Sequence, residues 1–181
     1  MKRIIIAVVG VLLVSAGAEA QTSAETIERA LTPLSGRAAE GAAVIKWNAD
    51  HTYTTLKEGT NAYVCYDRSG EPGQAAFAVQ CTNVGNLDRL AQNRRFAAEA
   101  PEREARAAMV KAAEANGTRV QAVYGSVWIA SNGPDRASAG RHVTVAVPGA
   151  TSASTGLPDT REAGGAWVMA AGTSEAHIMV P

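Results

Sequence analysis

The sequence predicts an α+β domain. We expect an antiparallel sheet built from an N-terminal meander and two C-terminal hairpin-like units, with two central helices packed on it. Three observations predict this class: short β-branched and aromatic segments come first, an Ala/Arg/Glu-rich stretch follows, and strand-like segments return in the last third. Because strands and helices form separate blocks rather than alternating, an α/β fold with a parallel sheet is not expected.

Composition restricts the class of protein further. The chain has 181 residues, of which 46% are hydrophobic and 19% are charged, as is typical of one globular domain. Seventeen basic side chains balance 17 acidic ones, so the surface lacks the summed positive field that nucleic acid or an anionic lipid surface requires. Much of the apolar content is alanine, which predicts a modest core.

The first 20 residues have the pattern of a secretory signal peptide. Lys2 and Arg3 precede an apolar run over residues 4–14, and Ala18-Glu19-Ala20 matches the small-x-small site cleaved before Gln21. The run is too short to span a bilayer, so an uncleaved membrane anchor is the weaker alternative. We therefore expect a periplasmic or secreted mature chain without a membrane span. Residues 21–41 should form a short helix and a linker, and residues 42–181 a single domain.

Four strands are expected at residues 43–47, 52–56, 62–66 and 76–80, which are rich in β-branched or aromatic residues. Turn-forming residues separate them at hairpin-like spacing, which predicts an antiparallel meander. Cys65 and Cys81, the two cysteines of the chain, fall in or next to the last two of these strands. In an exported chain such a pair favours a disulfide over a thiol metal or redox site. Closing a loop of about sixteen residues would contribute roughly 3 kcal/mol.

Two helices are expected at residues 87–98 and 101–116. Pro101 suits a first helical turn, and Gly117 suits the position after a helix end. In the second helix small side chains recur at helical spacing and predict the packed face, which comprises Ala105, Ala108, Met109, Ala112 and Ala113.

The last third contains a weak internal repeat. Each unit has a tryptophan-bearing strand, with Trp128 or Trp167, followed by an apolar strand headed by His142 or His177. The run over residues 143–147 predicts a strand inside the sheet rather than at its edge. Residues 149–165, rich in Ser, Thr, Gly and Pro, should form an exposed loop.

Several of these segments resemble a family of uncharacterised exported bacterial proteins. The similarity rests on Glu58-Gly59-Thr60-Asn61, on the two cysteines, and above all on two C-terminal segments, residues 164–169 and residues 172–181 ending in Ala176-His177-Ile178-Met179-Val180-Pro181. The resemblance implies export, a two-cysteine N-terminal half and a C-terminal His-apolar strand, and it implies no activity, substrate or cofactor.

Three hypotheses for function follow from the residues. The favoured one is a non-enzymatic domain that binds a small ligand or a protein through loops 131–141 and 149–165. The second is an extracytoplasmic transition-metal binder, with copper as one candidate, in which His142 and His177 are the ligands and Met179 offers a thioether. The third is a hydrolase using Ser126 or Ser174, although no nucleophile elbow or other hydrolase motif is present.

Two further features bear on these hypotheses. The glycines do not follow a phosphate-binding spacing, so no cofactor is predicted. Trp47, Trp128 and Trp167 are expected to be core anchors, with an exposed binding platform as the alternative.

Overall fold

The computed structural model describes residues 23–180 of the chain. The predicted signal peptide and its cleavage site lie outside these residues. Within them, no helix has the length and hydropathy needed to span a bilayer.

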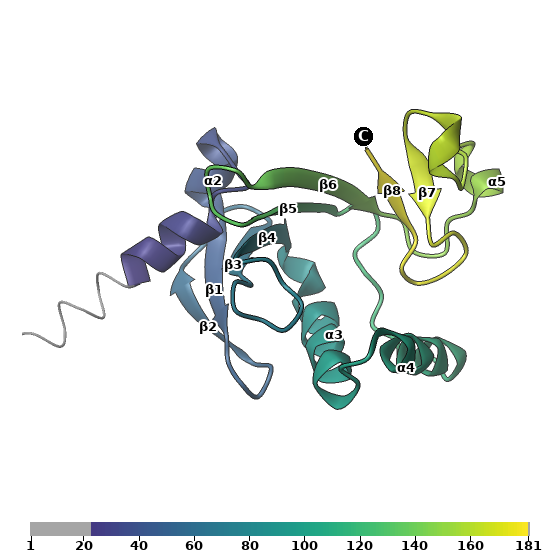
Figure 1. Ribbon diagram of the computed structural model, residues 1–181, viewed down its shortest axis with the longest axis horizontal. Coiled ribbons are helices and arrows are strands. Elements are labelled where there is room, and N and C mark those ends of the chain that lie inside the picture. The colour runs from purple at the N-terminus through teal and green to yellow at the C-terminus, as the bar shows by residue number, and fades with distance from the viewer. Residues whose placement is uncertain (1–22, 181) are drawn as a thin grey trace, which may run out of the picture.

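The described chain forms one eight-stranded sheet in the order β2-β1-β3-β4-β5-β6-β8-β7 (Figure 1). The strands are β1 (Ala43–Trp47), β2 (Tyr53–Lys57), β3 (Tyr63–Asp67), β4 (Phe77–Asn83), β5 (Val127–Gly133), β6 (Gly140–Ala146), β7 (Trp167–Met169) and β8 (His177–Met179). The predicted α+β class is confirmed. The sheet is mixed rather than purely antiparallel, because β1 and β3 are parallel and the other pairs are antiparallel.

The expected N-terminal meander is wrong at one step. β3 does not pair with β2 but crosses to the far side of β1, where Val44 lies opposite Cys65. The reason is burial: β3 has three consecutive buried residues, whereas the first three residues of β2 are exposed. A strand that is apolar on both faces is most stable inside a sheet, and a polar strand suits an edge.

The two C-terminal hairpin-like units are confirmed. β5 pairs with β6 and β7 pairs with β8, and the second unit joins the first through β6 and β8. β6 lies inside the sheet, as its apolar run predicts.

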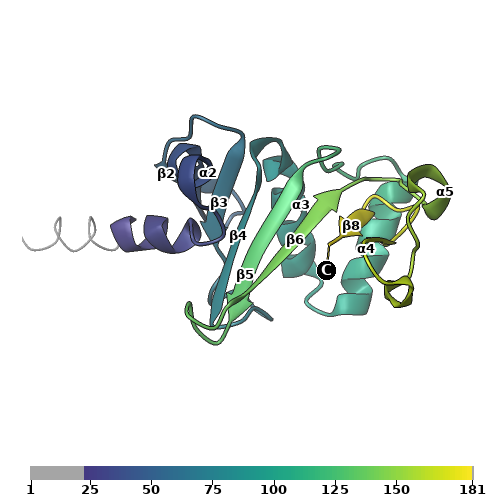
Figure 2. The ribbon, with the colours of Figure 1, turned by 90° about the horizontal axis from the view of Figure 1, so that it is seen from above.

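Helices cover both faces of the N-terminal half of the sheet. The helix at residues 23–30 packs Ala30 against Val44, Cys65 and Cys81. On the opposite face α3 (Leu87–Glu99) contributes Leu87 and Leu90, which pack with Ile45, Val64 and Tyr66. Neighbouring residues of a strand point to opposite faces, so Val44 and Ile45 belong to different layers of the core. Seen from above in Figure 2, α3 lies behind β5 and β6.

The segment expected as a helix and linker is therefore part of the core. Residues 23–30 are helical, and Ala30 is fully buried. A second short helix, α2 (Gly36–Gly41), leads into β1. The remaining short helices are η1 (Val84–Asn86), α5 (Ser152–Thr155) and η2 (Arg161–Ala163), the last two within the loop expected at residues 149–165.

The predicted packed face of α4 (Arg103–Ala115) is wrong by about one residue. Of the five residues predicted to pack, only Ala113 is buried, and Ala105, Ala108 and Ala112 are exposed. The covered side contains Arg106, Met109, Val110, Ala113 and Glu114. α4 packs beside α3 and beside the turn before β8, and it does not lie on a strand (Figure 1). In that turn the Ser174 backbone N–H donates to Glu114 Oε1 at 2.8 Å.

Candidate functional site

A hollow with a volume of about 910 Å³ lies at the C-terminal end of the sheet. It combines charged, aromatic and apolar side chains. Its lining consists of Arg141, His142, Val143, Asp159, Arg161, Trp167, Met169, Ala170, Met179 and Val180. We call this hollow the groove.

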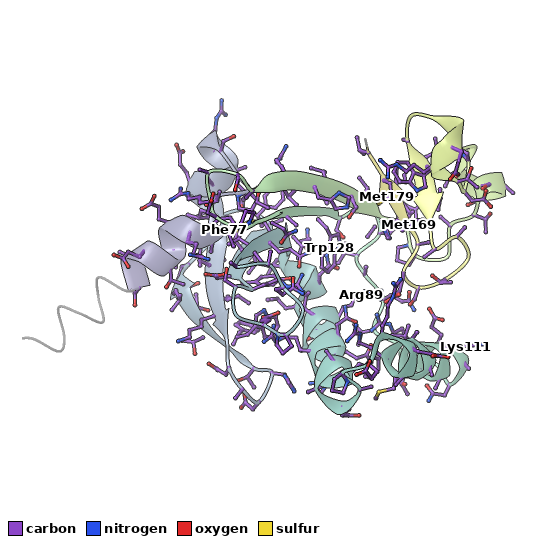
Figure 3. All side chains as sticks on the ribbon, in the orientation of Figure 1. Phe77, Arg89, Lys111, Trp128, Met169 and Met179 are labelled. Atoms are coloured by element: carbon purple, nitrogen blue, oxygen red, sulfur yellow. A yellow bond between two sulfur atoms is a disulfide. The ribbon has the colours of Figure 1, made fainter. Side chains whose placement is uncertain are left out.

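The floor of the groove follows from strand register. Met179 of β8 lies opposite Thr144 of β6 on one side and Trp167 of β7 on the other. Directly opposite residues, and residues two apart on a strand, share a face of the sheet. His142 and Met169 therefore lie on the same face as Met179 and Trp167. Figure 3 labels Met169 and Met179 on the adjacent C-terminal strands.

The rim of the groove is the loop expected from the sequence, and it is fixed in place. The Val168 backbone N–H donates to Pro158 O at 2.8 Å, which attaches the loop to the outer edge of β7. Within the loop, Thr151 and Ser154 form a capping box at the start of α5. This arrangement holds Asp159 and Arg161 beside the strands.

The surface of the groove is both apolar and cationic. Met169 and Val180 are each 48% exposed, so both present apolar surface to a molecule that enters the groove. Two guanidinium groups, of Arg141 and Arg161, line the groove together with the single carboxylate of Asp159 and the imidazole of His142. A concave site with apolar walls and a few charged groups is suited to a small molecule with an apolar body and a negative group.

A smaller hollow of about 380 Å³ lies at the other end of the sheet, beside Phe77 and the 134–136 turn. Both of its arginines are in ion pairs. Arg136 Nη1 lies 2.7 Å from Glu28 Oε1, and Arg29 lies 2.8 Å from Asp67 and stacks over the Phe77 ring. These pairs leave less charge available for a ligand than the groove does.

The structure does not bring the two proposed metal ligands together. β6 and β8 are neighbours but antiparallel, so His177 lies opposite Ala146, four residues from His142. At about 3.4 Å per residue this places the two histidines roughly 14 Å apart along the strands. His177 Nδ1 instead lies 2.7 Å from Glu175 O. Residues 23–180 contain no cluster of three or more His, Cys, Asp or Glu side chains that could hold a metal.

The two candidate serines take part in structural hydrogen bonds. Ser126 Oγ accepts from Asn86 Nδ2 at 3.0 Å, and Ser174 Oγ lies 3.4 Å from Arg119 Nε. Ser174 also donates to the Glu114 carboxylate, through its backbone N–H and its hydroxyl. Neither serine has a histidine among these partners, so no Ser-His pair is formed. The geometry of Ser126 and Ser174 therefore gives the hydrolase hypothesis no support.

The three tryptophans divide between the core and the groove. Trp47 packs edge-to-face with Tyr53 and Tyr66, and Trp128 packs against the core on the α3 side. Trp167 lines the groove. An aromatic platform of all three is therefore not formed.

The Cys65–Cys81 disulfide is present, and it joins directly opposite residues of β3 and β4. Both cysteines are fully buried. The bond lies in the N-terminal half of the sheet, away from the groove.

Sequence reasoning missed a buried polar network behind the C-terminal strands. Arg89 donates to Val120 O at 2.6 Å and to Ser174 O at 3.0 Å, and Arg119 donates to Gln92 and Glu175. Burial, followed by the nearby charge of Arg119, lowers the pKa of Arg89 to about 10. Nothing in the spacing of the α3 arginines marks Arg89 as buried. The network holds the turn that positions β8, and thereby the floor of the groove.

Comparisons with known proteins add no assignment. No protein-family profile matches the chain, and neither the curated proteins nor the solved structures contain a significant match.

Proposed function

We propose that this chain is an exported, non-enzymatic binding protein whose groove takes a small molecule with an apolar body and an anionic group. The observation that carries the proposal is the convergence of exposed Met169 and Val180 with Arg141 and Arg161 in one hollow. Apolar walls provide affinity by removing ligand surface from water, and guanidinium groups orient an anion.

Binding can be tested with anilinonaphthalene sulfonate, a fluorescent probe that has an aromatic body and a sulfonate. We expect saturable binding to the wild-type protein and an at least tenfold weaker affinity for the Arg141→Ala/Arg161→Ala double variant. Tenfold corresponds to about 1.4 kcal/mol, which is within the range of one charge-assisted hydrogen bond. Arg95→Ala, an exposed arginine of α3 outside the groove, is the matched control.

Equal affinity of the double variant and the wild type would show that the probe binds elsewhere and would remove the groove as the ligand site. If the double variant does bind the probe more weakly, competition between the probe and unlabelled fatty acids or aromatic carboxylates will narrow the class of ligand.

Export is supported by the signal-like pattern of residues 1–20 and by the Cys65–Cys81 disulfide, since disulfides persist in oxidising compartments. Mass spectrometry of the protein recovered from a bacterial periplasm or medium tests it. We expect an N-terminus at Gln21, and an intact leader with both cysteines reduced would contradict the proposal.

A further inference from the structure

Four side chains form two directly opposite pairs on one face of the β7–β8 ladder. Trp167 lies opposite Met179, and Met169 lies opposite His177. His177 and Met179 are also two residues apart on β8, so all four side chains project from the same side of the sheet. The four residues are the corners of one rectangle on the sheet, with two thioethers and an imidazole among them.

We infer that His177, Met169 and Met179 form a binding site for a soft monovalent cation, Cu(I) or its analogue Ag(I), beside the indole of Trp167. Thioether sulfur is a ligand that selects soft ions, and imidazole nitrogen also binds copper. Together the three side chains supply an N,S,S donor set.

The spacing allows these donors to meet at one ion. Directly opposite Cβ atoms lie about 4.5–5.5 Å apart, and residues two apart on a strand lie roughly 7 Å apart. Methionine has three rotatable bonds, so both sulfur atoms can turn toward the imidazole without movement of the backbone. The same spacing excludes His142 as a partner of Met169. Met169 and Ala146 both lie opposite His177, and His142 is four residues from Ala146 along β6.

The hydrogen bond of His177 prepares one ring nitrogen for the ion. Nδ1 lies 2.7 Å from Glu175 O, and a carbonyl oxygen only accepts, so Nδ1 carries the proton. In the neutral imidazole the lone pair of Nε2 is therefore available. A histidine that binds a metal through one nitrogen and donates the other N–H to a carbonyl is the common arrangement in metalloproteins.

The site is accessible and has an aromatic neighbour suited to a cation. Met169 is 48% exposed, His177, Met179 and Trp167 are half-buried, and Met169, Met179 and Trp167 border the groove. A cation held near the face of an indole is stabilised electrostatically by the ring. Harder metals would need carboxylate, thiolate or several imidazole ligands, and the described residues contain no such cluster.

This inference does not depend on the proposed groove ligand, because the two sites use different charged groups. His177 does not line the groove, and Arg141 and Arg161 take no part in the cation site. Variants can therefore separate the two functions.

The experiment is a titration of silver nitrate into the oxidised protein in chloride-free buffer, followed by calorimetry and tryptophan fluorescence. Silver has no redox chemistry under these conditions, and Cys65 and Cys81 are bonded to each other, so no thiol competes. We expect one Ag(I) per chain with micromolar or tighter affinity and a change in tryptophan emission. His177→Asn and the double variant Met169→Leu/Met179→Leu should each weaken binding at least tenfold.

Three controls complete the design. Met109→Leu in α4 and His142→Asn should bind Ag(I) as the wild type does. The probe sulfonate should bind His177→Asn normally, while Arg141→Ala/Arg161→Ala should bind Ag(I) normally. Leucine conserves the volume of methionine, so folding is expected to survive and can be checked by circular dichroism.

Absence of saturable Ag(I) binding to the wild type, or unchanged binding by His177→Asn or by the methionine double variant, would overturn the inference. A loss caused by His142→Asn would overturn it equally. Each of these results would leave the proposed groove function intact, and a loss of probe binding alone would leave the cation site intact.

Discussion

Asn86 shows at the scale of a single residue how a polar group can be stable in the core. It is fully buried between η1 and α3. Its Nδ2 donates to Thr82 and Ser126, and its Oδ1 accepts from the Val123 backbone N–H at 2.8 Å. One amide thus connects β4, the 118–126 segment and the start of β5, and its bonds to Thr82 and Ser126 join buried groups.

We expect Asn86→Ala to lower the free energy of unfolding by about 2–4 kcal/mol, because the buried hydroxyls of Thr82 and Ser126 and the Val123 N–H lose a partner at once. Urea unfolding followed by fluorescence measures the change. Asn93→Ala in α3, which lies in the same helix and is only half-buried, should change it by less than about 0.5 kcal/mol. Similar values for the two variants would show that the network contributes little.

Glu114 predicts a pH dependence. Hydrogen bonds from Ser174, through its hydroxyl and its backbone N–H, hold the pKa of the carboxyl below its ordinary value of 4.5. A carboxyl with a lowered folded-state pKa stabilises the protein above the unfolded pKa, and this contribution is lost as pH falls through the folded value.

The stability advantage of the wild type over Glu114→Gln should therefore be present at neutral pH and be lost progressively as the pH falls below the ordinary pKa of 4.5 and through the lower folded-state pKa. Urea midpoints measured over this pH range test the prediction. Glu104→Gln, an exposed carboxyl in the first turn of the same helix, serves as the control. A constant difference between wild type and Glu114→Gln at every pH would contradict it.

At the scale of elements, α4 illustrates the limit of helical periodicity. The pattern of small residues is real, but in a helix this rich in alanine it fits several faces almost equally well. The buried face was selected by contact with α3 and with the turn before β8, which are distant in sequence.

Two adjacent alanines test the observed face of α4. Ala113→Leu should destabilise the protein by about 1–3 kcal/mol, because Ala113 is 5% exposed and has no room for a larger side chain. Ala112→Leu, on the exposed side, should be neutral or slightly stabilising. Thermal unfolding distinguishes the two variants, and a larger loss of stability in Ala112→Leu than in Ala113→Leu would contradict the observed face.

The disulfide stabilises the pairing of β3 with β4. It closes a loop of 16 residues, for which the chain-entropy relation gives roughly 3 kcal/mol. We expect Cys65→Ala/Cys81→Ala to lose about 2–4 kcal/mol, with dithiothreitol destabilising the wild type but leaving the double variant unchanged. Chemical denaturation with and without the reductant provides the measurement, and an unaffected wild type would argue against a stabilising bond.

At the scale of the whole molecule, buried arginines connect the two halves of the structure. The side chain of Arg119 is only 1% exposed, and it contacts Gln92, Glu175 and the ring of Phe96. Arg119 and Arg89 both donate to the turn before β8, and so connect α3 to that turn. These bonds explain how the short β7–β8 hairpin keeps its register.

Arg119→Ala should therefore loosen the C-terminal hairpin more than the rest of the sheet. We expect faster amide hydrogen exchange over residues 174–179 and little change in β3 and β4, because those strands are held by their own core and by the disulfide. Arg103→Ala, exposed on α4, is the control. Uniform acceleration across the sheet would mean that the arginine supports global stability instead.

Sequence determined the local features of this protein. The α+β class, most strand positions, both C-terminal hairpins and the Cys65–Cys81 bond follow from residue type, turn residues and spacing, because these depend on interactions between near neighbours in the chain. Of the two segments expected as binding loops, residues 149–165 contribute Asp159 and Arg161 to the groove. The expected loop 131–141 is partly strand: its ends belong to β5 and β6, and Arg141, which lines the groove, lies in β6.

Tertiary structure decided what depends on partners far apart in sequence. It placed β3 between β1 and β4, buried Arg89 and Arg119, and separated His142 from His177 because β6 and β8 run in opposite directions. The antiparallel pairing of β7 and β8 brought His177 opposite Met169, and no property of either segment alone encodes that meeting. Register is set by which faces can be buried together, and this is a property of the assembled sheet.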